Sequence, residues 1–359
     1  MNKRQFTTKE LLKSRIDRTV LKSNYLYALA KAFRSRKDKE FLSAIRDSNS
    51  LVHFRCKNGN YGIPPVCVFN GFPKTGMFAY LRSVADFLFF CDCMGFEAYI
   101  RWSDSICYDA SIIDIDNPFE YFFVQPSGLT SDSLASRVVV DYAPGIIMKA
   151  RECTEGSSYN PGYAYIDELA SIVSAHLQFN PPTSVVLRQF IEKYDINEHT
   201  LGVHIRGTDF KNNYKWHPVY VAPEQYYPTI DRAFENHHFD KMFLATDDSE
   251  ILGSFLSHYG SELVVYEKET LRDDGKLGIH VMAQSNKSLS PYREALNALC
   301  DMIGLSYCGG FVSGLSNVAM FARIYNRSRN SRYIFDEIVN NEVNLKSHSP
   351  KRRSVSDRK

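Results

Sequence analysis

Apolar residues along this chain form short runs that end abruptly in small polar loops. The sharpest case is the segment LGVHIRGTDFK at residues 201–211, where the apolar run 201–205 is followed by Arg206, Gly207, Thr208 and Asp209. This profile predicts a buried strand that ends in a polar loop. The arginine at such a strand end can hold an anionic group through charge-assisted hydrogen bonds, and the glycine permits close approach of backbone or ligand.

Two further segments repeat this change from apolar to polar residues. KMFLATDDSE at 241–250 ends in the paired carboxylates Asp247 and Asp248, and DMIGLSYCGGFVSGLSNVAMFA at 301–322 passes through small and hydroxyl residues before a helical pattern. In open α/β sheets, ligands bind outside the carboxyl ends of the strands. The sequence therefore predicts that the three loops converge on one site.

The remaining periodicity predicts alternating strands and helices in both halves of the chain. In the first half we expect a strand at 66–69, a helix at 77–94, a strand at 98–102, and helices at 167–177 and 184–193 with Pro181 and Pro182 between them. In the second half, after the strands at 201–205 and 242–246, we expect helices at 223–236, 250–259, 291–305 and 317–325, and strands at 263–266 and 311–312.

This order predicts an α/β protein with two Rossmann-like domains and parallel sheets. The expected ranges are 1–50 for an N-terminal helical extension, 51–195 for the first domain, 196–344 for the second and 345–359 for a disordered basic tail. The glycine-bearing loop at 70–75 does not match GxGxxG, and it reads equally as a tight turn or as part of a site. For the aromatic segment NPFEYFFVQP at 117–126 we expect a packing role.

Composition narrows the class of protein. The 359 residues are 44% hydrophobic and 23% charged, as in ordinary globular proteins, and the net charge of +2 gives no reason to expect a nucleic-acid partner. The eight cysteines form no CxxC pair, so we expect no zinc site. The sequence does not decide whether any of them form disulfide bonds. The polar start, MNKRQFTTKELLKSR, lacks a signal-peptide pattern and no apolar run is long enough to span a membrane, so we expect a cytoplasmic protein.

Five motifs, taken in order, resemble those of the α-1,6-fucosyltransferase and NodZ-like group: GVHIRGTD, His217 with Pro218, FLATDD, ALCDMIGLS and SGLSNV. The close match covers residues 200–325. The resemblance implies two Rossmann-like domains facing each other across a cleft, the GT-B architecture. It also implies a GDP-fucose donor, inversion at the anomeric carbon, and no metal or other cofactor.

The same resemblance implies roles for individual residues. His204 corresponds to a contact on the guanine or ribose side of GDP, Arg206 to the arginine on the donor phosphates, and Asp209 to the aspartate that braces this loop. Further positions correspond to the paired aspartates, the guanine-reading aspartate and the polar turn near the diphosphate: Asp247, Asp248, Asp301, Ser316 and Asn317. Gly207 replaces a second arginine and Phe210 replaces a lysine, and the group's following glutamate has no clear counterpart in 211–216. We therefore expect a related bacterial enzyme with a different acceptor, such as a glycan or polysaccharide-precursor hydroxyl, working in the cytoplasm or at the inner membrane.

Fucosyl transfer with inversion requires a cation for the leaving GDP and a base for the acceptor hydroxyl. We expect Arg206 to be the cation, with Lys211 as a possible helper, and the base to be Asp209, His217 or Glu224.

Structural roles remain open for the other positions. His204 can be a core histidine, Asp247 or Asp248 can cap the helix at 250–259 or bind a divalent cation, and Asp301 can form a surface salt bridge. A glycosyltransferase for another nucleotide sugar and a non-catalytic nucleotide-sugar-binding protein are the alternative functions.

Overall fold

The computed structural model describes residues 66–71, 76–94, 96–102, 107–137, 139–141, 162–207, 210–212, 217–266 and 290–344. The expected N-terminal extension at 1–50, most of the loop at 70–75, the tail at 345–359 and Asp209 lie outside these ranges. The chain splits into two compact units. The first runs to Val186 and takes in Ser290–Tyr292 and Arg323–Ser331, and the second comprises Leu187–Leu289, Arg293–Ala322 and the chain from Arg332.

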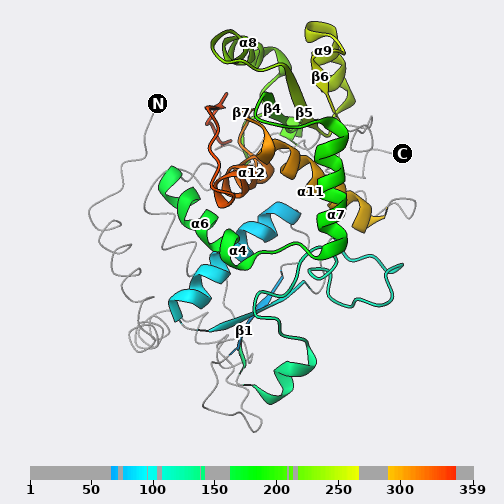
Figure 1. Cartoon of the computed structure of the whole chain (residues 1–359), viewed down its shortest axis with the longest axis vertical. Coiled ribbons are helices and arrows are strands. Elements are labelled where there is room, and N and C mark those ends of the chain that lie inside the picture. Colours follow the sequence, from blue (N-terminus) through cyan, green and yellow to red (C-terminus); the bar gives the residue numbers. More distant parts are fainter. Residues whose placement is uncertain are drawn as a thin grey trace, which may run out of the picture. The chain divides into compact units, whose positions relative to one another are not determined.

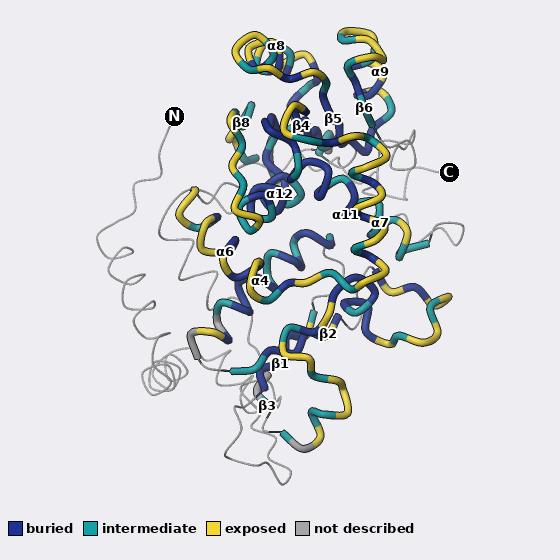
Figure 2. Tube along the Cα trace, in the orientation of Figure 1, coloured by how far each residue is buried: buried dark blue, intermediate teal, exposed yellow. Residues whose placement is uncertain are grey.

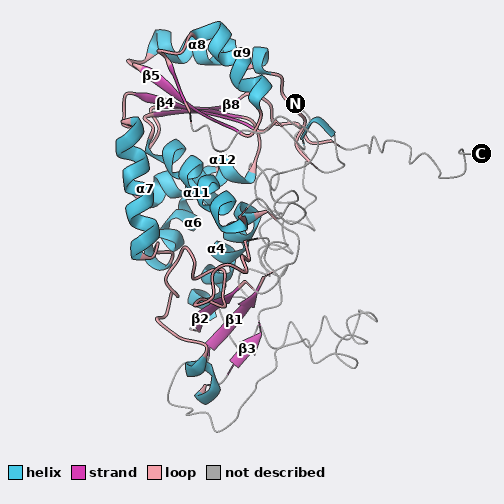
Figure 3. Ribbon diagram, turned by 90° about the vertical axis from the view of Figure 1, so that its right-hand side faces the viewer, coloured by secondary structure: helices cyan, strands magenta, loops and turns pink. Residues whose placement is uncertain are grey.

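The first unit contains a parallel sheet in the order β2-β1-β3 (Figure 3). β1 (Val66–Asn70) pairs with β2 (Glu97–Arg101) on one side and with β3 (Val139–Asp141) on the other. Helix α4 (Met77–Met94) connects β1 to β2 and packs against both (Figure 1). The predicted β-α-β unit is therefore confirmed. The sequence did not predict β3, whose three residues are too few to show a period.

Side chains of residues 117–127 cover the free edge of β2. Gln125 accepts a hydrogen bond from the Ile100 N–H (2.9 Å) and donates one to the Ile100 carbonyl (2.8 Å). Asn117 accepts from the Trp102 N–H (3.0 Å) and donates to the same carbonyl (2.7 Å). An edge strand with unpaired backbone groups invites pairing with other chains, and here amide side chains satisfy those groups. The segment NPFEYFFVQP thus has the packing role that its composition predicted.

Buried aromatic rings of the same segment pack against Trp102, which follows β2. The fully buried Trp102 meets Phe119 edge-on at 5.3 Å between centroids, and Phe119 stacks on Phe123 at 5.1 Å. Phe123 in turn stacks on Phe179, which precedes α7 (Pro181–Tyr194). The two prolines at 181–182 were expected to separate two helices, but they open α7 itself. Proline suits the first helical turn because the missing N–H has no helical partner there.

Helix α6 (Tyr163–His176) precedes α7 and packs on α4. The cysteines of both units that the structure describes with their side chains are buried free thiols: Cys67, Cys91, Cys107, Cys300 and Cys308.

The second unit contains a parallel sheet in the order β6-β5-β4-β7-β8. Its strands are β4 (Thr200–Ile205), β5 (Lys241–Thr246), β6 (Val264–Val265), β7 (Gly310–Ser313) and β8 (Phe335–Ile338). β4 is buried along its whole length, as expected of a central strand with helices on both faces. The prediction of a second sheet with alternating helices is confirmed. β8 was missed because its sequence, FDEI, is half polar and all four residues are only partly buried.

Helices cover both faces of this second sheet. α8 (Tyr227–Asn236) and α9 (Ser249–Tyr259) lie on one face, and α11 (Pro291–Tyr307) and the start of α12 (Asn317–Ser328) lie on the other (Figure 3). The helix expected at 223–236 is divided: a 3₁₀ turn at Pro223–Gln225 precedes α8. Figure 2 shows the central strands β4 and β5 buried and the outer sides of α8 and α9 exposed.

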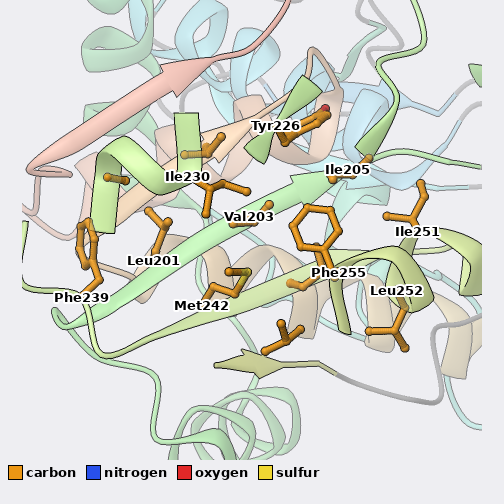
Figure 4. Packing of buried hydrophobic residues seen from close by; sticks show 14 of the residues in the cluster. Leu201, Val203, Ile205, Tyr226, Ile230, Phe239, Met242, Ile251, Leu252 and Phe255 are labelled. Carbon is orange, nitrogen blue, oxygen red and sulfur yellow. The ribbon is translucent and has the colours of Figure 1, made fainter. Parts of the chain in front are cut away.

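Alternation along β4 assigns its side chains to the two faces. Leu201, Val203 and Ile205 belong to one hydrophobic cluster with residues of α8 and α9, including Ile230 and Phe255 (Figure 4). Gly202 and His204 therefore face α11 and α12. A Cβ atom at Gly202 would lie 3.2 Å from the Cys308 sulfur, so a side chain here would press the strand away from this layer.

Candidate functional site

Three strands of the second sheet bring their polar loops to one edge. In the parallel register, Ile205 of β4 pairs with Thr246 of β5, and His204 pairs with Ser313 of β7. The loop after β7 is joined to β4 directly, since the Gly314 N–H donates to the His204 carbonyl at 3.3 Å. The predicted convergence of the three loops is therefore confirmed.

Arg206 follows the central strand and is held by a buried carboxylate. Its guanidinium Nη1 lies 2.5 Å from Oδ2 of Asp247, which is 5% exposed. The other oxygen of Asp247 accepts the Gly207 N–H at 2.9 Å. One carboxylate thus fixes the side chain of Arg206 and the backbone after it. The Arg206 side chain keeps 21% of its surface exposed, so a ligand can reach it.

Asp248 has different partners from its neighbour. One oxygen caps α9, because it accepts the backbone N–H groups of Glu250 (2.9 Å) and Ile251 (3.4 Å). The other oxygen lies 2.7 Å from Nζ of Lys211. The expectation that one of the two aspartates caps this helix is confirmed, and the capping residue is Asp248.

Lys211 is bound between two carboxylates. It pairs with Asp248 and, at 3.0 Å, with Glu250. Burial opposes the charged form, but the hydrogen bonds to these carboxylates outweigh it and raise the pKa of Lys211. The lysine therefore remains charged at neutral pH and ties the loop after β4 to the start of α9.

The loop after β7 ends in a helix N-terminus. The buried hydroxyl of Ser316 accepts the Ala319 N–H at 2.9 Å and so caps α12, whose first residue is Asn317. Helix N-termini present unpaired N–H groups and a positive dipole end, which favour anions. Tyr226, which sequence reasoning missed, supports this loop: its hydroxyl lies 2.6 Å from where a Cβ on Gly314 would be.

His204 is almost completely buried, at 6% exposure, and its Nδ1 lies 3.1 Å from the Ala245 carbonyl. This matches the structural alternative of a hydrogen-bonded core histidine, and its contact with a nucleotide stays a prediction.

Asp301 lies one turn before Gly304 in α11, and Gly304 packs on Phe243 of β5. Asp301 is itself half-buried in this helix, and its contact with guanine stays a prediction.

Of the three proposed bases, two lie within the described residues. Glu224 is exposed in the 3₁₀ turn before α8, and His217 is half-buried with its ring 6.1 Å from that of Phe210. Asp209 lies outside the described residues, so its role stays a prediction. The backbone beside His217 is bonded to residues near the end of the second unit, a contact that no sequence pattern indicated.

The residues that the structure describes lack two kinds of feature. They contain no cluster of three or more histidine, cysteine, aspartate or glutamate residues placed to bind a metal ion. They also contain no helix that is both long and apolar enough to cross a membrane.

Comparison with known proteins gives matches only among solved structures, since no family model and no curated protein matches this chain. A NodZ alpha-1,6-fucosyltransferase co-crystallised with GDP matches with a TM-score of 0.46 and 14% identity, over 73% of this chain and 92% of the other. POFUT1 in complex with GDP matches with a TM-score of 0.41 and 10% identity, over 79% and 99% of the two chains. A mutant of Arabidopsis thaliana FUT1 in complex with GDP matches with a TM-score of 0.42 and 10% identity, over 84% and 77%. Likeness at this level is too low to transfer the role of any residue.

Proposed function

We propose that this chain is a glycosyltransferase that moves fucose from GDP-fucose to a hydroxyl of a glycan or polysaccharide precursor. The observation that carries the proposal is the clamped, partly exposed Arg206 at the carboxyl edge of β4, on a sheet edge where α12 also begins. A fixed guanidinium and a helix N-terminus together suit a diphosphate. The order of the five motifs along the chain supports fucose and guanine as the specific donor groups.

In the proposed reaction the acceptor oxygen bonds to the anomeric carbon while the bond from that carbon to the β-phosphate oxygen breaks. GDP leaves with the bonding electrons, and its growing negative charge is stabilised by Arg206 and the start of α12. The acceptor proton passes to a base, for which His217, Asp209 and Glu224 are the candidates. A single displacement inverts the anomeric carbon. We propose that no metal is needed because protein groups supply the positive charge.

Binding of GDP, UDP and ADP, measured by calorimetry with and without EDTA, tests the donor site. We expect GDP to bind best, without sensitivity to EDTA, and Arg206→Ala to weaken GDP about 10- to 100-fold, as expected for a lost charged hydrogen bond. Arg206→Lys tests the bidentate geometry and should recover only part of the affinity. Arg232→Ala is the matched control, because Arg232 is an exposed arginine that pairs with Glu337 on β8.

Three outcomes would contradict parts of this proposal. Preference for another nucleotide would mean that the donor is not GDP-fucose. Loss of binding in EDTA would overturn the proposal that no metal is needed. Absence of any nucleotide binding would overturn the site itself. Asp301→Asn should weaken GDP more than UDP, because a carboxylate accepts two hydrogen bonds from guanine; equal loss for both nucleotides would remove Asp301 from the site.

Turnover separates an enzyme from a binding protein. Release of GDP from GDP-fucose, followed with water and with a panel of oligosaccharides as acceptors, should be faster than the uncatalysed rate. Selective GDP binding without turnover in any of these assays would favour the non-catalytic alternative.

A further inference from the structure

The residues after β8 form an antiparallel bridge with residues 217–219, which we call the His-Pro loop. Val219 donates its N–H to the Glu342 carbonyl at 3.0 Å, and Asn344 donates its N–H to the His217 carbonyl at 2.9 Å. These two bonds flank the pair Pro218–Val343. We call residues 339–344 the C-terminal segment.

The pairing pattern explains how a proline is accommodated in this bridge. In an antiparallel ladder, residues in a non-hydrogen-bonded pair need no N–H toward the partner strand. Pro218 occupies that position, so its missing N–H costs nothing. The Pro218 carbonyl is also used, since Nδ2 of Asn344 donates to it at 3.3 Å. Asn344 is therefore a double donor that binds both carbonyls of the His-Pro dipeptide.

The C-terminal segment is itself fixed to the sheet that carries the site. β8 pairs with β7 up to Ile338 opposite Ser313, and the next N–H, that of Val339, donates to the Ser313 carbonyl at 2.9 Å. Val339 also packs against the cluster that includes Val203 and Ile205. Through the C-terminal segment, the His-Pro loop is therefore attached to the ends of β4 and β7. The same two strand ends carry Arg206 and the start of α12.

We propose that Asn344 is a positioning residue for His217, and that His217 is the base of the reaction. Pro218 is buried and His217 is half-buried, so in an extended segment, whose side chains alternate, the His217 side chain lies on the side opposite to Pro218. Two bonds from Asn344, to the carbonyls of His217 and Pro218, then fix the backbone that carries that imidazole. This inference rests on the proposed function, since a base is needed only if a hydroxyl is activated.

The acceptor proton moves to His217 while the acceptor oxygen bonds to the anomeric carbon and GDP departs. His217 loses that proton to solvent after the sugar has left. The C-terminal segment takes no part in this exchange and acts only through the placement of the imidazole.

The test is a double-mutant cycle read by kcat for GDP release from GDP-fucose, with water and with the oligosaccharide panel as acceptors. His217→Gln should lower kcat about 100-fold or more, as expected for a lost general base. Asn344→Pro, which removes both donors, should lower kcat about 10- to 100-fold through misplacement of the base. Asn344→Ala removes only the side-chain donor and should cost about 2- to 10-fold. In the His217→Gln background neither change at 344 should lower kcat further.

Controls keep the outcomes distinct. Glu342→Ala retains the carbonyl that bonds Val219 and should behave as the wild type, and so should a chain that ends after Asn344. The dissociation constant for GDP should change less than twofold in every variant.

Additive losses in the cycle, or normal kcat in Asn344→Pro, would overturn the inference while the proposed function stood. If Asn344→Pro fails to fold, Asn344→Ala carries the cycle alone, and an additive loss there would have the same meaning. A wild-type chain that neither binds GDP nor releases it from GDP-fucose would overturn the proposed function and this inference together.

Discussion

Replacement of Gly207 by alanine tests the packing at the end of β4. A Cβ atom at this position would lie 2.4 Å from Cβ, 2.6 Å from Oδ2 and 2.9 Å from Cγ of Asp248. All three distances are well inside van der Waals contact, so either the backbone after Arg206 or Asp248 must move. The family resemblance marks this glycine as the replacement of an arginine, whereas in the structure a Cβ atom here would collide with Asp248.

The cost follows from how firmly Asp248 is held. Movement of its side chain would break the cap of α9, worth about 0.5–2 kcal/mol, and overpacking in a buried site costs about 1–3 kcal/mol. The two terms share one relaxation and do not add in full. We therefore expect Gly207→Ala to lower the free energy of unfolding by about 2–4 kcal/mol.

Chemical denaturation followed by circular dichroism measures this change, with Gly253→Ala as the matched control. Gly253 lies within α9, and a Cβ there would meet no atom within 4 Å, so that change should stabilise by about 0.4–1 kcal/mol. Asp248→Gly removes the crowded atoms while it keeps an acceptable cap residue. The double variant should accordingly lose less stability than the sum of the single changes. An unaltered midpoint for Gly207→Ala would refute this account of the glycine.

Three other perturbations test the remaining contacts. Asp247→Ala should weaken GDP about 5- to 30-fold in calorimetry by freeing Arg206, with nucleotide preference unchanged; tighter binding would mean that repulsion between Asp247 and phosphate outweighs positioning. Asp109 is buried, which raises its pKa, but hydrogen bonds from Ser111 and Ser290 outweigh this effect and lower the pKa to about 2. The contribution of Asp109 to the free energy of unfolding is therefore full above about pH 4 and is lost as the pH falls toward 2. In an acid titration, the wild type should lose about 1–2 kcal/mol of stability over this range, and Asp109→Asn should not show this loss. Gln125→Ala leaves the Ile100 N–H without its acceptor, while Asn117 still donates to the Ile100 carbonyl, and should cost about 1–3 kcal/mol in denaturation, more than Ser127→Ala, which removes the acceptor of a partly buried N–H.

The fold could be predicted where burial imposes a period on the sequence. β4 and β5 are buried strands between helices, so they read as apolar runs, and the 3.6-residue pattern identified α4, α9 and α11 within a few residues. β3 and β8 lie at the edges of their sheets and are short or half polar, so no pattern marked them. Proline signals were ambiguous for another reason: Pro181 serves equally as a helix breaker and as a first helical residue.

The meeting of the three loops at one sheet edge was predictable, but the contacts that their residues make within the chain were not. A carboxylate that follows a strand can accept hydrogen bonds from a ligand, a helix N-terminus or a neighbouring arginine. The sequence pattern is the same in all three cases, so it cannot distinguish them. At this edge the adjacent aspartates divide these uses, with Asp248 on α9 and Lys211 and with Asp247 on Arg206 and Gly207. The cap at Ser316 is another polar group engaged by the chain itself.

These assignments change how the site would recognise an anion. Three residues that look like ligand contacts in the sequence bond to the chain itself: Asp247, Asp248 and Ser316. Under the proposed function, Arg206 and the start of α12 are then the groups that would face a diphosphate. Such a site would bind by preorganised charge, because Arg206 is already held by Asp247 and little reorganisation would be required. Affinity at this edge should therefore depend on the rigidity of Asp247, Gly207 and Asp248 as much as on Arg206 itself.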